Sequence, residues 1–174
     1  PAQMDVNITA GHPANDQQLG SKDPVTVWNR HTQELWLLYE VHTNSAQQPK
    51  QTAVWIARTK DGRRWFGHRK AWEEQLMGLG PGSATQLQTG PHKGRVIVPA
   101  YGPWPNSPCN GPKRDWSSDC FDRAAVFFTD DGVKFSRSVL VGGPSAVNDT
   151  FLGFAEPVPV ELGNGTVRFD MRNE

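Results

Sequence analysis

The feature that most constrains this chain is a seven-residue pattern that occurs twice, at Thr59–Trp65 and at Thr129–Phe135. The first copy reads TKDGRRW and the second reads TDDGVKF. Each has a hydroxyl residue, any residue, Asp, Gly, two further residues and a large aromatic residue. Each also follows an apolar run, TAVWIAR before the first copy and RAAVFF before the second. The chain is therefore predicted to use one strand-and-turn unit at least twice.

The residue types in this pattern fit a tight turn between two strands. An Asp carboxylate can accept hydrogen bonds from the backbone N–H groups of its own turn, and Gly adopts the positive φ that the reversal needs. The closing aromatic residue is expected to fold back on the turn and to be buried between neighbouring sheets. We interpret the following residues as structural: Thr59, Asp61, Gly62, Trp65, Thr129, Asp131, Gly132 and Phe135.

Short apolar runs separated by turn signals continue along the chain. Period-2 alternation predicts a hairpin over Asp23–Val41, and Thr52–Thr59 is predicted to be a third strand. The tract AWEEQLM at 71–77 is ambiguous, because it also fits one or two turns of helix, and 1–20 is interpreted as loop or a strand remnant. About eight to ten short strands and few helices predict an all-β fold. A corner repeated at one place in a sheet unit is typical of β-propellers.

Charge and composition exclude several classes of protein. The chain has 18 Lys+Arg against 18 Asp+Glu, so it carries no basic footprint for nucleic acid. Its 36% hydrophobic and 21% charged residues are enough for a packed core. No window approaches the roughly 20 apolar residues of a membrane helix, so no membrane span is expected in this segment. The five histidines are scattered without ligand spacing, so we expect neither a metal nor another cofactor.

The two cysteines and three glycosylation acceptors bear on the compartment. Cys109 and Cys120 bracket a polar loop; they are either unrelated thiols or a local disulfide, which would require an oxidising compartment. Asn-x-Thr triplets begin at Asn7, Asn148 and Asn164. Together these features favour a secreted protein or one in a vesicular or lysosomal lumen, while a cytoplasmic location stays open.

The repeated pattern resembles the Asp box of sialidases (neuraminidases) and several other propellers. The family form is Ser/Thr-x-Asp-(x)-Gly-x-Thr-Trp/Phe, from which this chain departs at Arg64 and Lys134, where a Thr is usual. Three further segments are similar to sialidase segments and occur in the family's order. They are DPVTVWNRHTQELWLLY, GPGSATQLQTGPHKGRVIVPAYG and FAEPVPVELGNGTVRFDMRN, and the resemblance covers about 22–173. It implies a six-bladed propeller, of which residues 1–174 supply about three blades as a partial domain.

The resemblance assigns roles to three residues. Glu156 matches the glutamate that, in sialidases, hydrogen-bonds the nucleophilic tyrosine and takes up its proton. Arg172 matches the second arginine of the triad that binds the substrate carboxylate, and Tyr101 matches a tyrosine that lines the pocket. Without the resemblance, Glu156 would be read as an exposed strand residue and Arg172 as a solvated one. Tyr101 would equally be read as packing on the prolines that follow it.

The function that the resemblance implies is that of an exo-α-sialidase, which releases terminal sialic acids with retention through a tyrosyl-enzyme intermediate. Its partners would be sialylated glycoproteins, glycolipids or oligosaccharides. The first arginine, the acid/base aspartate, the third arginine and the nucleophilic tyrosine find no match in this chain. Because the chain also opens on Pro1 rather than Met, we expect it to be a segment, with the rest of the propeller in the same or a second chain. The alternative is a non-catalytic Asp-box propeller that acts as a glycan-binding module or pseudo-enzyme.

Overall fold

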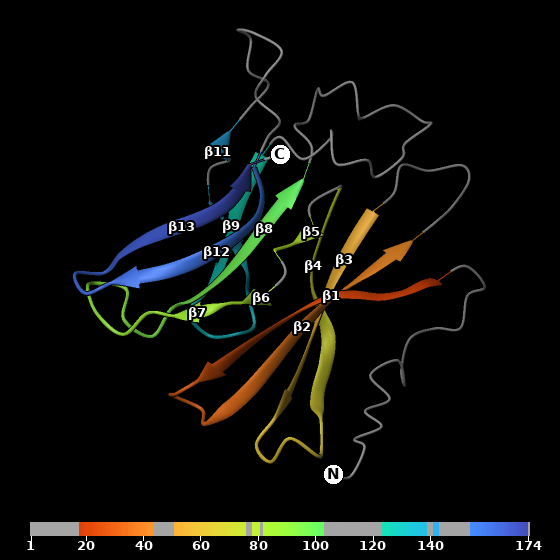
Figure 1. Ribbon diagram of the computed structural model, residues 1–174. Helices are drawn as coiled ribbons and strands as arrows, with labels where there is room; N and C mark the ends of the chain where they lie inside the picture. The colour runs from red at the N-terminus through yellow and green to blue at the C-terminus, as the bar shows by residue number, and fades with distance from the viewer. Residues whose placement is uncertain are drawn as a thin grey trace, which may run out of the picture.

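The computed structural model describes residues 18–43, 51–75, 78–80, 82–102, 123–138, 141–142 and 154–173 (Figure 1). The described residues contain β-strands and turns and no helix, so the all-β prediction is confirmed. The strands form three sheets, whose long strands follow one another along the chain. None of the described residues belongs to a helix long and apolar enough to cross a membrane.

The first sheet is a four-stranded antiparallel meander of long strands. Its strands are β1 (Gln18–Asn29), β2 (Glu34–Thr43), β3 (Gln51–Thr59) and β4 (Phe66–Gln75). The short strand β6 (Gly82–Ser83) adds to β1 in parallel. The predicted hairpin and third strand are therefore confirmed. The ambiguous tract is strand as far as Gln75, because pairing with β3 outweighs its helical propensity.

The second sheet is built around the antiparallel pair β8 (Val96–Gly102) and β9 (Arg123–Thr129). The edge next to β8 consists of two short strands, β5 (Gly78–Leu79) and β7 (Thr85–Gln86), which both pair with β8. The edge next to β9 consists of β10 (Ser136–Arg137) and β11 (Val141–Gly142), which both pair with β9. Each edge is therefore made of two short strands, whereas the two central strands are continuous.

The third sheet is the hairpin of β12 (Phe154–Leu162) and β13 (Thr166–Asn173). The sequence predicts an Asn-Gly turn here, and the turn consists of the three residues 163–165, with Gly165 at φ 82. A three-residue loop that ends in a left-handed glycine is a common hairpin connection. The blue strand β12 lies beside the green strand β8, and β13 pairs with β12 (Figure 1).

The core lies between the first and second sheets. The side of the first sheet that carries Val25, Val27 and Leu38 packs on the side of the second that carries Val98 and Ala125. Aromatic rings complete this interface: Trp72 of β4 stacks on Phe127 of β9 with ring centroids 4.2 Å apart. Each fully buried side chain of Val, Leu or Phe size contributes about 1.5–3 kcal/mol. This interface therefore holds the two sheets in a fixed relation.

Candidate functional site

The two copies of the repeated turn have the same geometry. In the first, the Asp61 carboxylate accepts hydrogen bonds from the backbone N–H groups of Arg63 and Arg64, both at 2.8 Å. The Thr59 hydroxyl accepts from the backbone N–H of Gly62 at 2.9 Å. The second copy repeats these bonds: Asp131 accepts from 133 and 134 at 2.7 and 2.9 Å, and Thr129 accepts from Gly132 at 2.8 Å. Both glycines have positive φ, 72° and 67°.

These bonds shift the acid–base properties of both turns in the same direction. The backbone N–H groups of Arg64 and then Arg63 hold the pKa of Asp61 below its usual value. Those of Lys134 and then Val133 do the same to the pKa of Asp131. The prediction that each Asp ties its own turn is therefore confirmed. Each carboxylate binds its own turn through Oδ1, so we interpret both as structural.

The aromatic residues that close the turns are half-buried, less deeply than the sequence predicts. Phe135 does lie between the first two sheets, since its ring centroid is 5.0 Å from that of Trp72. Trp65 packs on the other side of the first sheet, against Leu37, Tyr39 and Val41. On that side the Tyr39 hydroxyl is hydrogen-bonded to His68.

Among the residues that the structure describes, the second turn docks on a neighbouring sheet and the first does not. A Cβ at Gly132 would lie 2.3 Å from the Trp36 ring, whereas a Cβ at Gly62 would meet nothing within 4 Å. The carbonyl oxygen of Gly132 accepts a hydrogen bond from the Arg58 guanidinium at 2.8 Å and another from Arg69. Burial lowers the pKa of Arg69, the Arg58 charge lowers it further, and the nearby Asp131 opposes both. The second turn is therefore a joint between the two sheets.

The residues that the resemblance singles out lie at the opposite end of the strands. Thr129, which begins the second turn, pairs with Val96 at the start of β8, whereas Tyr101 pairs with Ala124 at the other end of β8. Tyr101 is half-buried and pairs with Gly78 on its other side. We call the end of the sheets that carries the repeated turns the turn end, and the opposite end the Tyr101 end. The tip of the third sheet contacts the turn end, because Gly165 of the β12–β13 turn abuts Gly90 of the loop before β8. The first residues of β12 and the last of β13 consequently lie toward the Tyr101 end.

Glu156 occupies a strained bulge in β12. Ala155 pairs with Arg172 and Val158 with Asp170, so Glu156 and Pro157 together face one residue of β13. Glu156 is half-buried and has a φ of 52°, in the left-handed region that L-residues avoid. Strained backbone of this kind is concentrated at functional sites, where it re-aims a side chain.

Two of the predicted features cannot be placed in full. The Arg172 backbone lies across the hairpin from the residue before Glu156, while its side chain is outside the described part of the structure. Cys109 and Cys120 both lie outside the described residues. Asn164 is exposed at the tip of the β12–β13 hairpin, where its side-chain oxygen accepts a hydrogen bond from the backbone N–H of Thr166 at 3.0 Å.

A glycine segment, Gly78–Gly80, connects the three sheets at the Tyr101 end. The backbone N–H of Leu79 donates to the carboxylate of Glu40, a β2 residue that is only 1% exposed. Gly78 has no room for a side chain, because a Cβ would lie 2.6 Å from that carboxylate. A Cβ at Gly80 would lie 2.7 Å from the carbonyl oxygen of Pro157. Glu40 was not among the predicted site residues, although a Glu inside the apolar run ELWLLYEV is a signal for a buried carboxylate.

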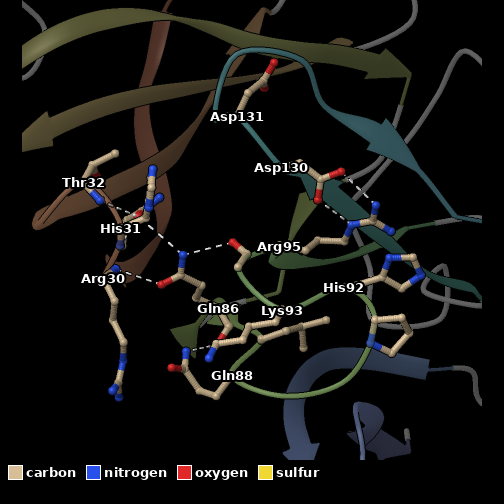
Figure 2. Close-up of a pocket in the computed structure, with 14 residues that line it drawn as sticks. Arg30, His31, Thr32, Gln86, Gln88, His92, Lys93, Arg95, Asp130 and Asp131 are labelled. Atoms are coloured by element: carbon tan, nitrogen blue, oxygen red, sulfur yellow. Dashed lines mark hydrogen bonds and ion pairs between the residues drawn. The ribbon is translucent and has the colours of Figure 1, made fainter.

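The turn end carries an open polar cavity of about 970 Å³ (Figure 2). A frame of buried amides builds it: the Gln86 side chain accepts from the backbone N–H of Arg30 at 2.8 Å and donates to the carbonyl of Gly94 at 3.0 Å. On the opposite wall, Arg95 binds both carboxylate oxygens of Asp130 at 2.7 and 2.8 Å. This ion pair raises the pKa of Arg95 and lowers that of Asp130.

Neither end holds a recognisable metal site within the described residues, where His, Cys, Asp and Glu form no group of three that could bind an ion. Comparison with known families adds no assignment: no protein-family model matches the chain. The arrangement therefore has to be interpreted from its own chemistry. A half-buried Glu on strained backbone, next to a backbone position that carries Arg and near a half-buried Tyr, can exchange a proton and bind an acidic ligand.

Proposed function

We propose that this chain forms part of an exo-α-sialidase, a retaining glycoside hydrolase that releases terminal sialic acids. The observation that carries the proposal is the left-handed bulge at Glu156, beside the Ala155–Arg172 pair. The same residue is the one to which the sialidase resemblance gives a proton-transfer role. A strained acidic residue that is also the motif residue favours function over a solvated strand position.

The fold supports the finer proposal of a six-bladed propeller to which this chain contributes about three blades. The first sheet is an up-and-down meander, and the second has the same strand order with broken edges. The third sheet consists of the antiparallel hairpin β12–β13, which matches the hairpin β1–β2 that begins the first sheet. The two repeated turns follow β3 and β9, so both lie at the end of the sheets that is away from Tyr101. This separation of structural turns from the candidate site agrees with the sialidase pattern.

The proposed chemistry fits these residue types. Sialic acid carries a carboxylate, so a carboxylate nucleophile would be repelled, and sialidases use a tyrosine instead. Glu156 would take the proton of that tyrosine as the tyrosine oxygen bonds to the anomeric carbon and the glycosidic bond breaks, while the acid/base aspartate protonates the leaving alcohol. When water then breaks the tyrosyl–sugar bond, the aspartate would take a proton from the water and Glu156 would return its proton to the tyrosine. Arg172 would bind the substrate carboxylate with two parallel hydrogen bonds from its planar guanidinium. The nucleophilic tyrosine, the acid/base aspartate and the other arginines are proposed to lie elsewhere in the complete propeller.

Substitution of Glu156 and Arg172 in the complete protein tests this function. Glu156→Gln and Arg172→Ala are each expected to lower kcat/KM on a fluorogenic sialoside by at least about 100-fold, since each removes a charged group from the reaction. Arg168→Ala on β13 is the matched control, because Arg168 is exposed and pairs only with Asp170 among the described residues. This control should keep activity within about threefold.

The result also separates the two candidate functions. Full activity in Glu156→Gln, with circular dichroism unchanged, would end the catalytic assignment. Sialoside binding without turnover in the unmodified protein would favour the non-catalytic, glycan-binding alternative.

A further inference from the structure

The turn end carries an excess of positive charge, although the whole chain has 18 Lys+Arg against 18 Asp+Glu. Four of the loops at this end, namely 30–33, 60–65, 88–95 and 130–135, together contain seven Lys or Arg and three Asp. The seven cations are Arg30, Lys60, Arg63, Arg64, Lys93, Arg95 and Lys134. We call the surface that carries them the basic face.

The four loops adjoin one another in the fold. Leu35, just after the first loop, pairs with Thr59, just before the second. Val96, just after the third loop, pairs with Thr129, just before the fourth. The docking of the second repeated turn on the first sheet brings these two pairs of loops together.

The aspartates of these loops already have partners. Asp61 and Asp131 each bind the backbone of their own turn, and Asp130 is paired with Arg95. Within the described part of the chain, the side chains of the other six cations make no hydrogen bond or ion pair, and all six are exposed. The basic face therefore presents a positive potential that an anionic ligand can neutralise.

Two of these cations stand where the Asp box usually has Thr, namely Arg64 and Lys134. Their backbone N–H groups donate to Asp61 and Asp131 at 2.8 and 2.9 Å, so the turns use only the backbone of these residues. Both departures from the family form add a charge to the same face. The local turn geometry therefore does not account for these side chains, whereas an anionic ligand would.

The cavity of Figure 2 opens in the basic face. Arg30 and His31 lie on one side of it, and Arg95 and His92 lie on the other. Lys93 also lines the cavity. Cationic side chains thus surround a space of about 970 Å³, which is large enough for a sugar unit.

The frame of this cavity is fixed by buried amides. Asn29 and Gln86 are only 6% and 8% exposed. The Asn29 side-chain oxygen accepts from the backbone N–H groups of His31 and Thr32 at 3.0 and 3.1 Å, and Gln86 ties the β1–β2 turn to the loop before β8. Loops that are held in place before a ligand arrives lose less entropy on binding.

We propose that the basic face is a binding site for a linear acidic polysaccharide, with one sugar unit held in the cavity. Arg30 and Lys93 bind a sulfate or carboxylate group of that unit, and the cations of the repeated turns bind groups farther along the ligand. The site lies at the end of the sheets opposite Glu156. It is therefore separate from the proposed catalytic site and does not depend on sialidase activity.

The shape and the lining of the site favour a polysaccharide over other anionic partners. The lining includes Thr32 and Gln88, and hydroxyl and amide groups can hydrogen-bond sugar hydroxyls. A flat lipid surface cannot enter such a cavity. Cations on four loops also require several anions along one ligand, which a single small anion does not supply.

The test measures binding of a heparin octasaccharide to the complete protein by isothermal titration calorimetry. One variant, Arg30→Gln with Lys93→Gln, removes two cations from the cavity. A second, Arg64→Thr with Lys134→Thr, restores the residue that the Asp box usually has. The matched control is Lys70→Gln with Arg168→Gln, which also removes one Lys and one Arg but from exposed positions on β4 and β13.

The cavity variant is expected to lose at least about tenfold in affinity and the turn variant about threefold or more, since charge-assisted hydrogen bonds are lost. The control should stay within about twofold, and affinity should fall as the salt concentration rises. Sialoside turnover and the urea midpoint of unfolding should be unchanged in all three variants.

The proposal is overturned if the unmodified protein does not bind the octasaccharide, or if the control loses as much affinity as the cavity variant. Equal binding of neutral maltooctaose overturns it as well. Tighter binding of phosphatidylserine vesicles or of a DNA duplex than of the octasaccharide would assign the basic face to another class of partner. Because the readout is binding, each of these results leaves the proposed sialidase function intact.

Discussion

Alanine at Gly132 should destabilise the fold far more than alanine at Gly62, although the two glycines have the same local geometry. Their φ values are 67° and 72°, and each amide donates to the hydroxyl of the threonine that begins its turn. Alanine in the left-handed region costs about 1–2 kcal/mol at either position. The local contribution therefore cancels when the two variants are compared.

The remaining cost arises at Gly132 alone. A Cβ there would lie 2.3, 2.8 and 3.0 Å from three atoms of the Trp36 ring, so either the ring or the turn must move. Overpacking of this kind costs about 1–3 kcal/mol. Movement of the turn would also weaken the 2.8 Å bond from Arg58 to the Gly132 carbonyl. We expect Gly132→Ala to lower the free energy of unfolding by about 2–3 kcal/mol more than Gly62→Ala.

Urea denaturation followed by tryptophan fluorescence measures both variants directly. Trp36→Phe provides a double-mutant cycle, because it removes ring atoms that the new methyl group would strike. The cycle should show a coupling of at least about 1 kcal/mol between positions 36 and 132. Equal destabilisation by Gly62→Ala and Gly132→Ala, within about 0.5 kcal/mol, would refute the docking of the second turn on the first sheet.

Two further predictions concern pH. The pKa of Asp131 is lowered in the fold, so its contribution to stability is present above the ordinary value of 3.8 and is lost as pH falls through the lower folded value. Asp131→Asn should therefore flatten the fall of the urea midpoint as pH is lowered below 3.8, and an unchanged slope would contradict the turn geometry. Burial raises the pKa of Tyr39 from 10.0 to about 12, so stability should decline as pH rises from 10.0 toward 12. Tyr39→Phe should remove a tyrosinate absorbance step near pH 12 while circular dichroism still reports a folded chain. No change in absorbance near pH 12 on this substitution would contradict the burial of Tyr39.

Local features of the fold could be predicted from the sequence, and long-range ones could not. The repeated turns were predictable because the Thr, Asp and Gly that form the hydrogen bonds lie within four residues of one another. The strand at 71–75 was ambiguous because its own propensity competes with its pairing to β3, which only the folded sheet supplies. The docking of Gly132 on Trp36 joins residues far apart in the chain, and one sequence carries no signal for it.

The candidate site was predictable only in part, for the same reason. Glu156 could be named from the motif, but its left-handed φ depends on the offset between β12 and β13. The burial of Glu40 depends on Leu79, on another sheet.

The distribution of strain between the two ends of the sheets is an independent argument for where function lies. At the turn end, the left-handed Gln33 lies in the β1–β2 turn, and Glu161 accepts three hydrogen bonds from Gln88 and Thr89 at 2.7 to 2.8 Å. The backbone N–H of Gln88 lowers the pKa of Glu161 most. At the Tyr101 end, Asp23 and Glu156 have left-handed backbones, with φ values of 47° and 52°, within strands where no turn requires them. A fold keeps such costs where they serve a ligand. If stability alone had shaped that end, glycine at 23 and 156 would be the better choice.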